Sequence, residues 1–386
     1  MSKIILNKGR EKSVIAGNKW IFSGAVKESD ADDGDIADII TSSGDFLGSA
    51  YYNSKTQIAA RVMCLGEKFT ESVLLKNIQS AVQRRKIARI HDDTDAFRLI
   101  FSEADNIPGF IADSFASHLS IQSLTLGADL LKNKIISILV DELKPKSVYE
   151  KSDHAGRKLE GVHAHSGQLY GETPDEVIIT EHGVKYPVDI KTGQKTGYFI
   201  DQRENRKLIK NISSGRTVLN LFSYTGGFSF AAIAGGASKA VSVDISADAL
   251  AIADKTAVLN GFEDKHDTIK ADIFDLIRSR DFNEDIIIID PPAFVKSKGA
   301  IDKGCRGYKD VNMNVFKRCA PNRIVLTCSC SRFINMDLFQ KIIFGAALDA
   351  KRNAYIIGKY SHPADHPVNI YHPETEYLKA ILLIVE

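Results

Sequence analysis

The strongest constraint on the fold is the alternation of short apolar runs with helical segments after residue 191. The strand candidates span residues 217–221, 239–244, 267–271, 285–290 and 323–328. The helical candidates span residues 228–234, 246–259, 310–319 and 336–348. Apolar strands that alternate with helices predict a parallel sheet with helices on both faces. We therefore expect an α/β, Rossmann-like domain, closed by strands near 353–360 and 377–385.

The chain before residue 191 has a different pattern. Short apolar runs separated by glycines up to about residue 66 predict a small β-barrel. The next stretch mixes helical patterns at 70–89 and 128–142 with strand candidates, which predicts an α+β domain. We therefore expect three domains, at residues 1–68, 69–190 and 191–386.

Net charge is +1, so no global field attracts a polyanion. Residues 1–27, however, carry six Lys and Arg side chains against Glu11 alone, which is typical of a nucleic-acid footprint or of a solvated face. Five cysteines without framework spacing indicate reduced thiols and a cytoplasmic setting. No apolar run reaches the roughly 18 residues of a membrane span, and no metal site is expected.

A cofactor site is predicted where the strand at 217–221 ends. Gly226 and Gly227 allow a tight turn and close approach of a ligand, and Asp244 ends the next strand, where an acid accepts hydrogen bonds from ribose hydroxyls. The three-glycine dinucleotide fingerprint is absent, so the ligand should lack a pyrophosphate, as S-adenosylmethionine does. Asp272 ends the third strand and could accept from the adenine amino group, with Ile273 beside the ring. A plain strand-helix connection is the alternative for the glycine pair alone.

Two further strand ends carry reactive groups. The run at 286–289 leads into Asp290, and the run at 324–326 leads to Cys328 and Cys330. If the chain stays extended, both cysteines share one face, so periodicity does not choose between a nucleophile and a buried structural thiol.

These motifs together resemble class I S-adenosylmethionine-dependent methyltransferases. More narrowly, they are similar to the bacterial family that methylates carbon 5 of cytosine in large-subunit (23S) ribosomal RNA. The similar segments span residues 220–227, 290–294 and 329–331, a PUA-like start at 8–12 and 20–24, the segment 195–203 and the loop 305–310. The resemblance covers essentially the whole chain. It implies a PUA RNA-binding barrel, a small α+β domain and a methyltransferase domain, in that order.

The resemblance also implies roles for single residues around the cofactor. Asp244 would lie at the ribose and Asp272 at the adenine. The residues that would line the cofactor are Phe222, Tyr224, Thr225, Gly226 and Gly227, and those that would close over it are Tyr198, Gln202 and Arg203.

Carbon 5 of cytosine is a poor nucleophile, and adding a thiolate to carbon 6 activates it. By family position Cys330 is the expected thiolate, Asp290 would hydrogen-bond the base, and Ala293 stands near where related enzymes carry a second cysteine for product release. The base that assists release is therefore unnamed. The expected RNA contacts are Pro291, Pro292, Phe294, Arg306, Tyr308, Lys8, Arg10 and Lys12, with the run Arg84, Arg85 and Lys86 as a further anchor.

Two other functions remain open from the sequence. An Asp-Pro-Pro-aromatic motif also suits methylation of an exocyclic amine, which needs no cysteine. A non-catalytic RNA-binding protein that kept the fold is the second alternative. Ribosomal RNA is the expected partner for the leading interpretation, and the oligomeric state, for which a homodimer is one candidate, stays open.

Overall fold

The computed structural model of the chain describes residues 1–193 and 196–386. These residues form two compact units, which we call unit 1 and unit 2. Unit 1 consists of residues 1–179, 188–200 and 364–375, and unit 2 consists of residues 180–187, 201–363 and 376–386. Lys195, in the segment expected to lead into the catalytic domain, lies outside the described residues.

Unit 1 begins with a six-stranded sheet in the order β2-β6-β5-β4-β1-β3. Its elements are β1 (Lys3–Leu6), α1 (Glu11–Ile15), β2 (Trp20–Phe22), β3 (Val26–Ser29), β4 (Ile36–Ile40), β5 (Phe46–Tyr52) and β6 (Ile58–Leu65). Ile4, Leu6, Ile39 and Val62 are completely buried and form the core of this sheet. The predicted β region is thus present as a six-stranded sheet.

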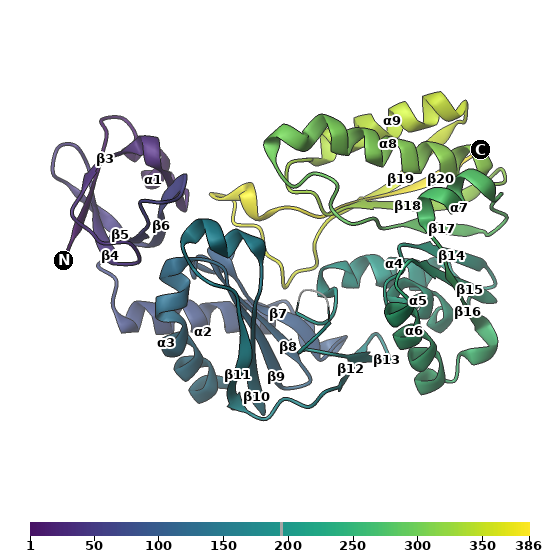
Figure 1. Cartoon of the computed structure of the whole chain (residues 1–386), viewed down its shortest axis with the longest axis horizontal. Coiled ribbons are helices and arrows are strands. Elements are labelled where there is room, and N and C mark those ends of the chain that lie inside the picture. Colours follow the sequence, from purple (N-terminus) through teal and green to yellow (C-terminus); the bar gives the residue numbers. More distant parts are fainter. Residues whose placement is uncertain (194–195) are drawn as a thin grey trace. The chain divides into compact units, whose positions relative to one another are not determined.

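A second sheet in unit 1 has the strand order β11-β10-β9-β8-β7 and packs with two helices (Figure 1). Its elements are α2 (Glu71–Ile87), β7 (Ala96–Phe101), β8 (Phe110–Phe115), β9 (His118–Ser123), α3 (Leu126–Leu143), β10 (Ser147–Ser152) and β11 (His165–Gly171). The Thr70 side chain caps α2 by accepting a hydrogen bond from the Val73 amide at 3.3 Å, as an N-cap threonine does. A two-stranded sheet of β12 (Val177–Glu181) and β13 (Val184–Val188) follows.

Unit 2 contains a seven-stranded sheet in the order β16-β15-β14-β17-β18-β20-β19. Its strands are β14 (Thr217–Leu221), β15 (Lys239–Asp244), β16 (His266–Lys270), β17 (Ile286–Ile289), β18 (Arg323–Ser329), β19 (Ala354–Tyr360) and β20 (Lys379–Val385). Its helices are α4 (Arg203–Ile212), α5 (Gly227–Ala234), α6 (Ala247–Asn260), α7 (Ile273–Ser279), α8 (Ile301–Arg318) and α9 (Met336–Ala350). Figure 1 shows α8 and α9 on one side of this sheet and α4, α5 and α6 on the other.

The unit 2 sheet differs from the expected all-parallel sheet at one edge. β14 to β18 pair in parallel, but β20 runs antiparallel to β18 and β19 antiparallel to β20. A parallel neighbour requires a crossover connection, and the chain between β19 and β20 contains no α-helix, so the last strand returns in the opposite direction. A second correction concerns residues 305–310, which lie inside α8 and not in a loop.

The centre of the unit 2 core is β17, whose four isoleucines are completely buried. Such continuous burial is expected of a parallel strand covered on both faces. β14 lies between β15 and β17, so strand order reverses beside it, and ligands bind at such points at the carboxyl ends of the strands. Within 1–193 and 196–386, no helix has both the length and the apolar character needed to cross a bilayer.

Candidate functional site

The turn after β14 is held by the carboxylate at the end of β15. One oxygen of Asp244 accepts a hydrogen bond from the Tyr224 amide at 2.8 Å, and the other accepts one from the Ser246 amide at 2.9 Å. Each carboxylate oxygen has two lone pairs, so both oxygens keep capacity for a ligand hydroxyl. Asp244 therefore shapes the turn and remains suited to bind a ribose.

The backbone of this turn adopts left-handed conformations at three positions. Phe222 and Tyr224 have φ values of 60° and 48°, and Gly226 has a φ of 81°. A Cβ atom on Gly226 would lie 2.7 Å from the Phe230 ring and 3.2 Å from the Ser242 hydroxyl. A side chain at position 226 would therefore be strained and would clash, which explains the glycine physically.

The acceptors at this edge of the sheet fit the cofactor expected from the sequence. Asp272 caps α7 by accepting a hydrogen bond from the Phe274 amide at 2.8 Å through one oxygen. Its second oxygen, like the remaining lone pairs of Asp244, can accept from a ligand. The ribose hydroxyls and the adenine amino group of S-adenosylmethionine are the matching donors. Ile273 is buried beside Asp272.

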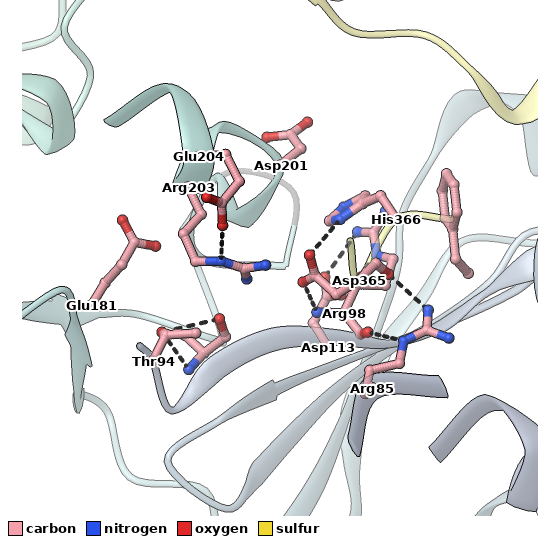
Figure 2. A network of polar contacts seen from close by, with 12 residues as sticks. Arg85, Thr94, Arg98, Asp113, Glu181, Asp201, Arg203, Glu204, Asp365 and His366 are labelled. Atoms are coloured by element: carbon pink, nitrogen blue, oxygen red, sulfur yellow. Dashed lines mark hydrogen bonds and ion pairs between the residues drawn. The ribbon is translucent and has the colours of Figure 1, made fainter. Parts of the chain in front are cut away.

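Gln202 and Arg203, which were expected to close over the cofactor, make contacts with other side chains in this structure. Gln202 donates a hydrogen bond to Asp290 at 3.0 Å and accepts one from Asn205 at 2.6 Å. Gln202 thus fixes the carboxylate that follows β17. Arg203 is almost completely buried and pairs with Glu204 at 3.3 Å (Figure 2). Tyr198, the third residue of this group, is buried in unit 1.

The two cysteines that periodicity alone does not separate have different environments. Cys328 lies within β18 and is completely buried. Burial, followed by the nearby Asp290 carboxylate, raises the pKa of the Cys328 thiol well above its usual value. Cys330 lies just beyond β18 and is partly exposed. The thiol that a substrate can reach is therefore Cys330.

The residue after Cys330 is fixed from two sides. The Ser331 hydroxyl lies 2.9 Å from the Tyr308 hydroxyl and accepts a hydrogen bond from the Val295 amide at 3.2 Å. Tyr308 is completely buried, and burial raises its pKa to about 12. Tyr308 was expected to contact RNA from a loop; it lies in the core on α8 and supports the cysteine segment. Arg306, on the same helix, is exposed.

Phe294 belongs to a row of aromatic rings that runs from the glycine turn to the cysteine segment. Ring centroids are 6.0 Å apart for Phe222 and Phe274, 6.1 Å for Phe274 and Phe294, and 4.6 Å for Phe294 and Tyr308. The sequence did not reveal this row. Because Phe294 is only partly buried, its ring can also contact a ligand. Pro291 before it is buried and Pro292 is exposed.

Lys379 is a site residue that sequence reasoning missed. It starts β20, has only 2% of its surface exposed, and donates hydrogen bonds at 2.6 Å to the carbonyl oxygens of both Ser331 and Tyr377. The sequence signal was a single charged residue opening the apolar run at 380–385.

The basic residues expected to contact RNA fall into two groups in unit 1. Lys8, Arg10 and Lys12 are exposed around α1, as an RNA-contacting surface requires. The expectation for Arg85 is wrong, because only 1% of its surface is exposed. Lys86 is exposed.

Arg85 belongs to a buried polar network in unit 1 (Figure 2). It donates to Asp105 at 2.7 Å, to the Arg98 carbonyl at 2.8 Å and to the Asp365 carbonyl at 2.7 Å. Arg98 donates two hydrogen bonds to Asp113, at 2.8 and 3.0 Å, and its amide donates to the Asp365 carboxylate at 2.8 Å. Arg85 and Arg98 each contact a buried carboxylate, as expected of a network that stabilises the fold.

Comparison with known proteins agrees with this geometry. Residues 156–368 match the model of the S-adenosylmethionine-dependent methyltransferase family, and residues 4–64 match that of a PUA-like domain. The chain is 40% identical to "Ribosomal RNA large subunit methyltransferase I" of Aeromonas salmonicida, over 98% of both chains, and equally identical to the protein of that name from an Enterobacter species, with the same coverage. The crystal structure of SMU.776, complexed with SAH, superposes with a TM-score of 0.87 at 25% identity over the full length of both chains. Together with the acceptors around the glycine turn, these matches show that the chain belongs to the S-adenosylmethionine-dependent methyltransferase family and uses this cofactor.

Proposed function

We propose that this enzyme methylates carbon 5 of a cytosine in large-subunit (23S) ribosomal RNA in the cytoplasm, with Cys330 as the nucleophile. The name shared by relatives that match nearly the whole chain supports the RNA substrate. The observation that carries the chemistry is the contrast between Cys328, which is completely buried, and Cys330, which is partly exposed beyond the same strand.

The position of Cys330 suits attack on a base held by Asp290. β17 and β18 pair in parallel, with Ile289 opposite Thr327, so Asp290 and the cysteine segment leave the sheet side by side. Gln202 orients the Asp290 carboxylate, which would accept a hydrogen bond from the amino edge of the cytosine.

The reaction follows from these groups. The Cys330 thiolate forms a bond to carbon 6, and carbon 5 becomes enamine-like and accepts a methyl group. Bound S-adenosylmethionine supplies that methyl group as an electrophile. Loss of the carbon-5 proton then restores the double bond as the bond between sulfur and carbon 6 breaks. Because position 293 is alanine, the proton acceptor is a group other than a second cysteine there.

RNA contacts outside the reacting base would come from exposed groups. Lys8, Arg10 and Lys12 on the PUA-like part would contact phosphates, and Arg306 would do so on α8. Pro292 and Phe294 would contact the base after it leaves its stack, as a ring-modifying enzyme requires, with Pro291 stiffening their loop.

The domain boundaries that we propose are those expected from the sequence, at residues 1–68, 69–190 and 191–386.

The direct test is labelled methyl transfer to RNA from a strain that lacks the protein, followed by nucleoside analysis. We expect 5-methylcytidine from the unaltered protein and only background from Cys330→Ala. Cys305→Ala, which removes a partly exposed thiol on α8, is the matched control and should keep full turnover. RNA with 5-fluorocytidine should form a covalent complex that requires Cys330, since fluorine blocks the final proton loss.

Full turnover by Cys330→Ala with cofactor bound would contradict the covalent mechanism and favour methylation of an exocyclic amine. A labelled nucleoside other than 5-methylcytidine would contradict the proposed position.

A further inference from the structure

Lys379 contacts the residues that flank Cys330. In the antiparallel pair of β18 and β20, Lys379 lies opposite Ser329, the residue before Cys330. Its ammonium group reaches the carbonyl oxygen of Ser331, the residue after Cys330, at 2.6 Å. The lysine therefore contacts the chain on both sides of Cys330.

The charge of Lys379 is placed in an environment that does not neutralise it. Within 1–193 and 196–386, its ammonium group has no carboxylate within ion-pair distance, and its hydrogen-bond partners are the carbonyls of Ser331 and Tyr377. Burial lowers the pKa of Lys379 to about 8, and Cys330 and Glu376 act against this decrease. A charge interaction between two groups is mutual, so a cation that is stabilised by a Cys330 thiolate also stabilises that thiolate.

We propose that Lys379 is a positioning residue that favours the thiolate form of Cys330 by its charge and fixes the following peptide by its hydrogen bonds. The use of this thiolate in catalysis rests on the proposed function. The effect of Lys379 on Cys330 is a property of the free protein and can be measured without RNA. A thiolate beside a lysine is a common means of activating a cysteine.

A role as the base that removes the carbon-5 proton fits the geometry less well. The Lys379 nitrogen is turned toward two backbone carbonyls and is almost completely buried. A proton acceptor must instead reach the reacting atom directly or through one water.

Other titratable groups also act on the cysteine segment and must be kept constant. Tyr308 on α8 and Cys328 on β18 interact electrostatically with Cys330, and Asp290 and Asp201 act on Cys328. The test therefore changes only Lys379.

The experiment measures the rate of alkylation of Cys330 by iodoacetamide as a function of pH, without RNA or cofactor. Fragment-ion mass spectrometry separates Cys330 from Cys328, which is completely buried and serves as an unreactive reference. Lys379→Gln keeps N–H donors but removes the charge, and we expect the alkylation midpoint to rise by about one pH unit or more. Lys379→Arg keeps the charge and should keep the midpoint within a few tenths of a unit.

Lys359→Gln is the matched control, because Lys359 is an exposed lysine on the neighbouring strand β19. It should leave the alkylation midpoint unchanged. Circular dichroism of each variant verifies that the fold is intact; if Lys379→Gln unfolds, Lys379→Met is measured in its place.

An unchanged midpoint in a folded neutral variant overturns the proposal, and so does an Arg variant that behaves like the Gln variant. Neither result depends on methyl transfer. Failure of the proposed function appears separately, as full methylation by Cys330→Ala.

Discussion

Arg98 and Arg85 in unit 1 and Lys379 in unit 2 are buried cations with different partners. In unit 1, Arg98 forms two hydrogen bonds with Asp113, and Arg85 contacts Asp105. In unit 2, Lys379 is equally hidden from water but has carbonyl oxygens as its hydrogen-bond partners. A buried charge with a matched carboxylate stabilises one structure, whereas a buried charge without one retains electrostatic influence on a neighbouring thiol.

Arg98→Met should have the largest effect on this contrast. It leaves the completely buried Asp113 without its cation, and breaking such a pair typically destabilises by about 3–5 kcal/mol. Urea unfolding followed by fluorescence reports on unit 1, because the single tryptophan, Trp20, lies there. Arg89→Met, at an exposed pair with Asp92, should change the unfolding free energy by less than about 0.5 kcal/mol. A loss below about 1 kcal/mol in Arg98→Met would contradict a structural role for the network.

Glu103 gives the second prediction, on acid sensitivity. Burial alone would raise the pKa of Glu103, but Arg61, with hydrogen bonds from Ser102 and Trp20, outweighs it and lowers the pKa to about 2. The resulting stabilisation is complete above pH 4.5, the usual value, and is lost as pH falls toward 2. The gap between these values corresponds to about 3 kcal/mol.

The measurement for Glu103 is the urea midpoint of the Trp20 transition between pH 6 and 2.5. Glu103→Gln should flatten the pH dependence, since a glutamine does not titrate. Trp20 is a suitable reporter because its indole donates a hydrogen bond directly to Glu103 at 2.8 Å. An acid profile identical to that of the unaltered protein would show that other carboxylates dominate.

Lys379 should show the opposite dependence on pH. Its pKa is lower in the folded chain than its usual 10.5, so the unfolded chain binds more protons above pH 8 and stability rises with pH there. With a folded value of about 8, the rise between pH 8 and 9.5 is about 1 to 2 kcal/mol. Circular dichroism follows the unfolding of both units in urea, and subtracting the Lys379→Met profile isolates the contribution of the lysine. A difference profile in which stability falls over this range would contradict the lowered pKa of Lys379.

The smallest expected effect is that of Lys379→Met on stability at pH 7. Removing the charge removes the cost of burying it, which stabilises the fold, while the carbonyls of Ser331 and Tyr377 lose their hydrogen-bond donor. We expect the two effects to offset to within about 1 kcal/mol. The Trp20 transition should not move. If this variant lost as much stability as Arg98→Met, the contrast between Arg98 and Lys379 would disappear.

The fold was largely predictable because its signals are local. The strands at 217–221 and 239–244 and the helix starting at 336 have the predicted bounds, since apolar periodicity and strand-ending acids mark them. The sequence patterns did not predict α4 and α7, because these helices are short or polar. They also did not predict the antiparallel direction of β20, which depends on the connection before it. The domain boundaries and the oligomeric state stay predictions.

The site was predictable only where the motif is contiguous. Gly226 and Asp244 follow directly from strand ends, whereas Gln202, Tyr308 and Lys379 act on residues 88, 23 and 48 positions away. Such contacts depend on tertiary packing, which no local pattern encodes. Spacing alone puts Cys328 and Cys330 on one face, so the prediction of Cys330 came from the family resemblance, and its greater exposure supports that prediction.

The segment between β19 and β20, which crosses from unit 2 into unit 1 and back, constrains the order in which the protein can fold during synthesis. Residues 364–375 leave unit 2 to complete unit 1, where Asp365 closes the arginine network, and the chain then returns to place Lys379 on β20. Domains usually fold as they emerge, amino-terminal part first. Here neither unit can finish before nearly all of the chain has left the ribosome. The cysteine at residue 330 would then gain its cation only in the last steps of folding, so a truncated chain would carry the thiol without its partner.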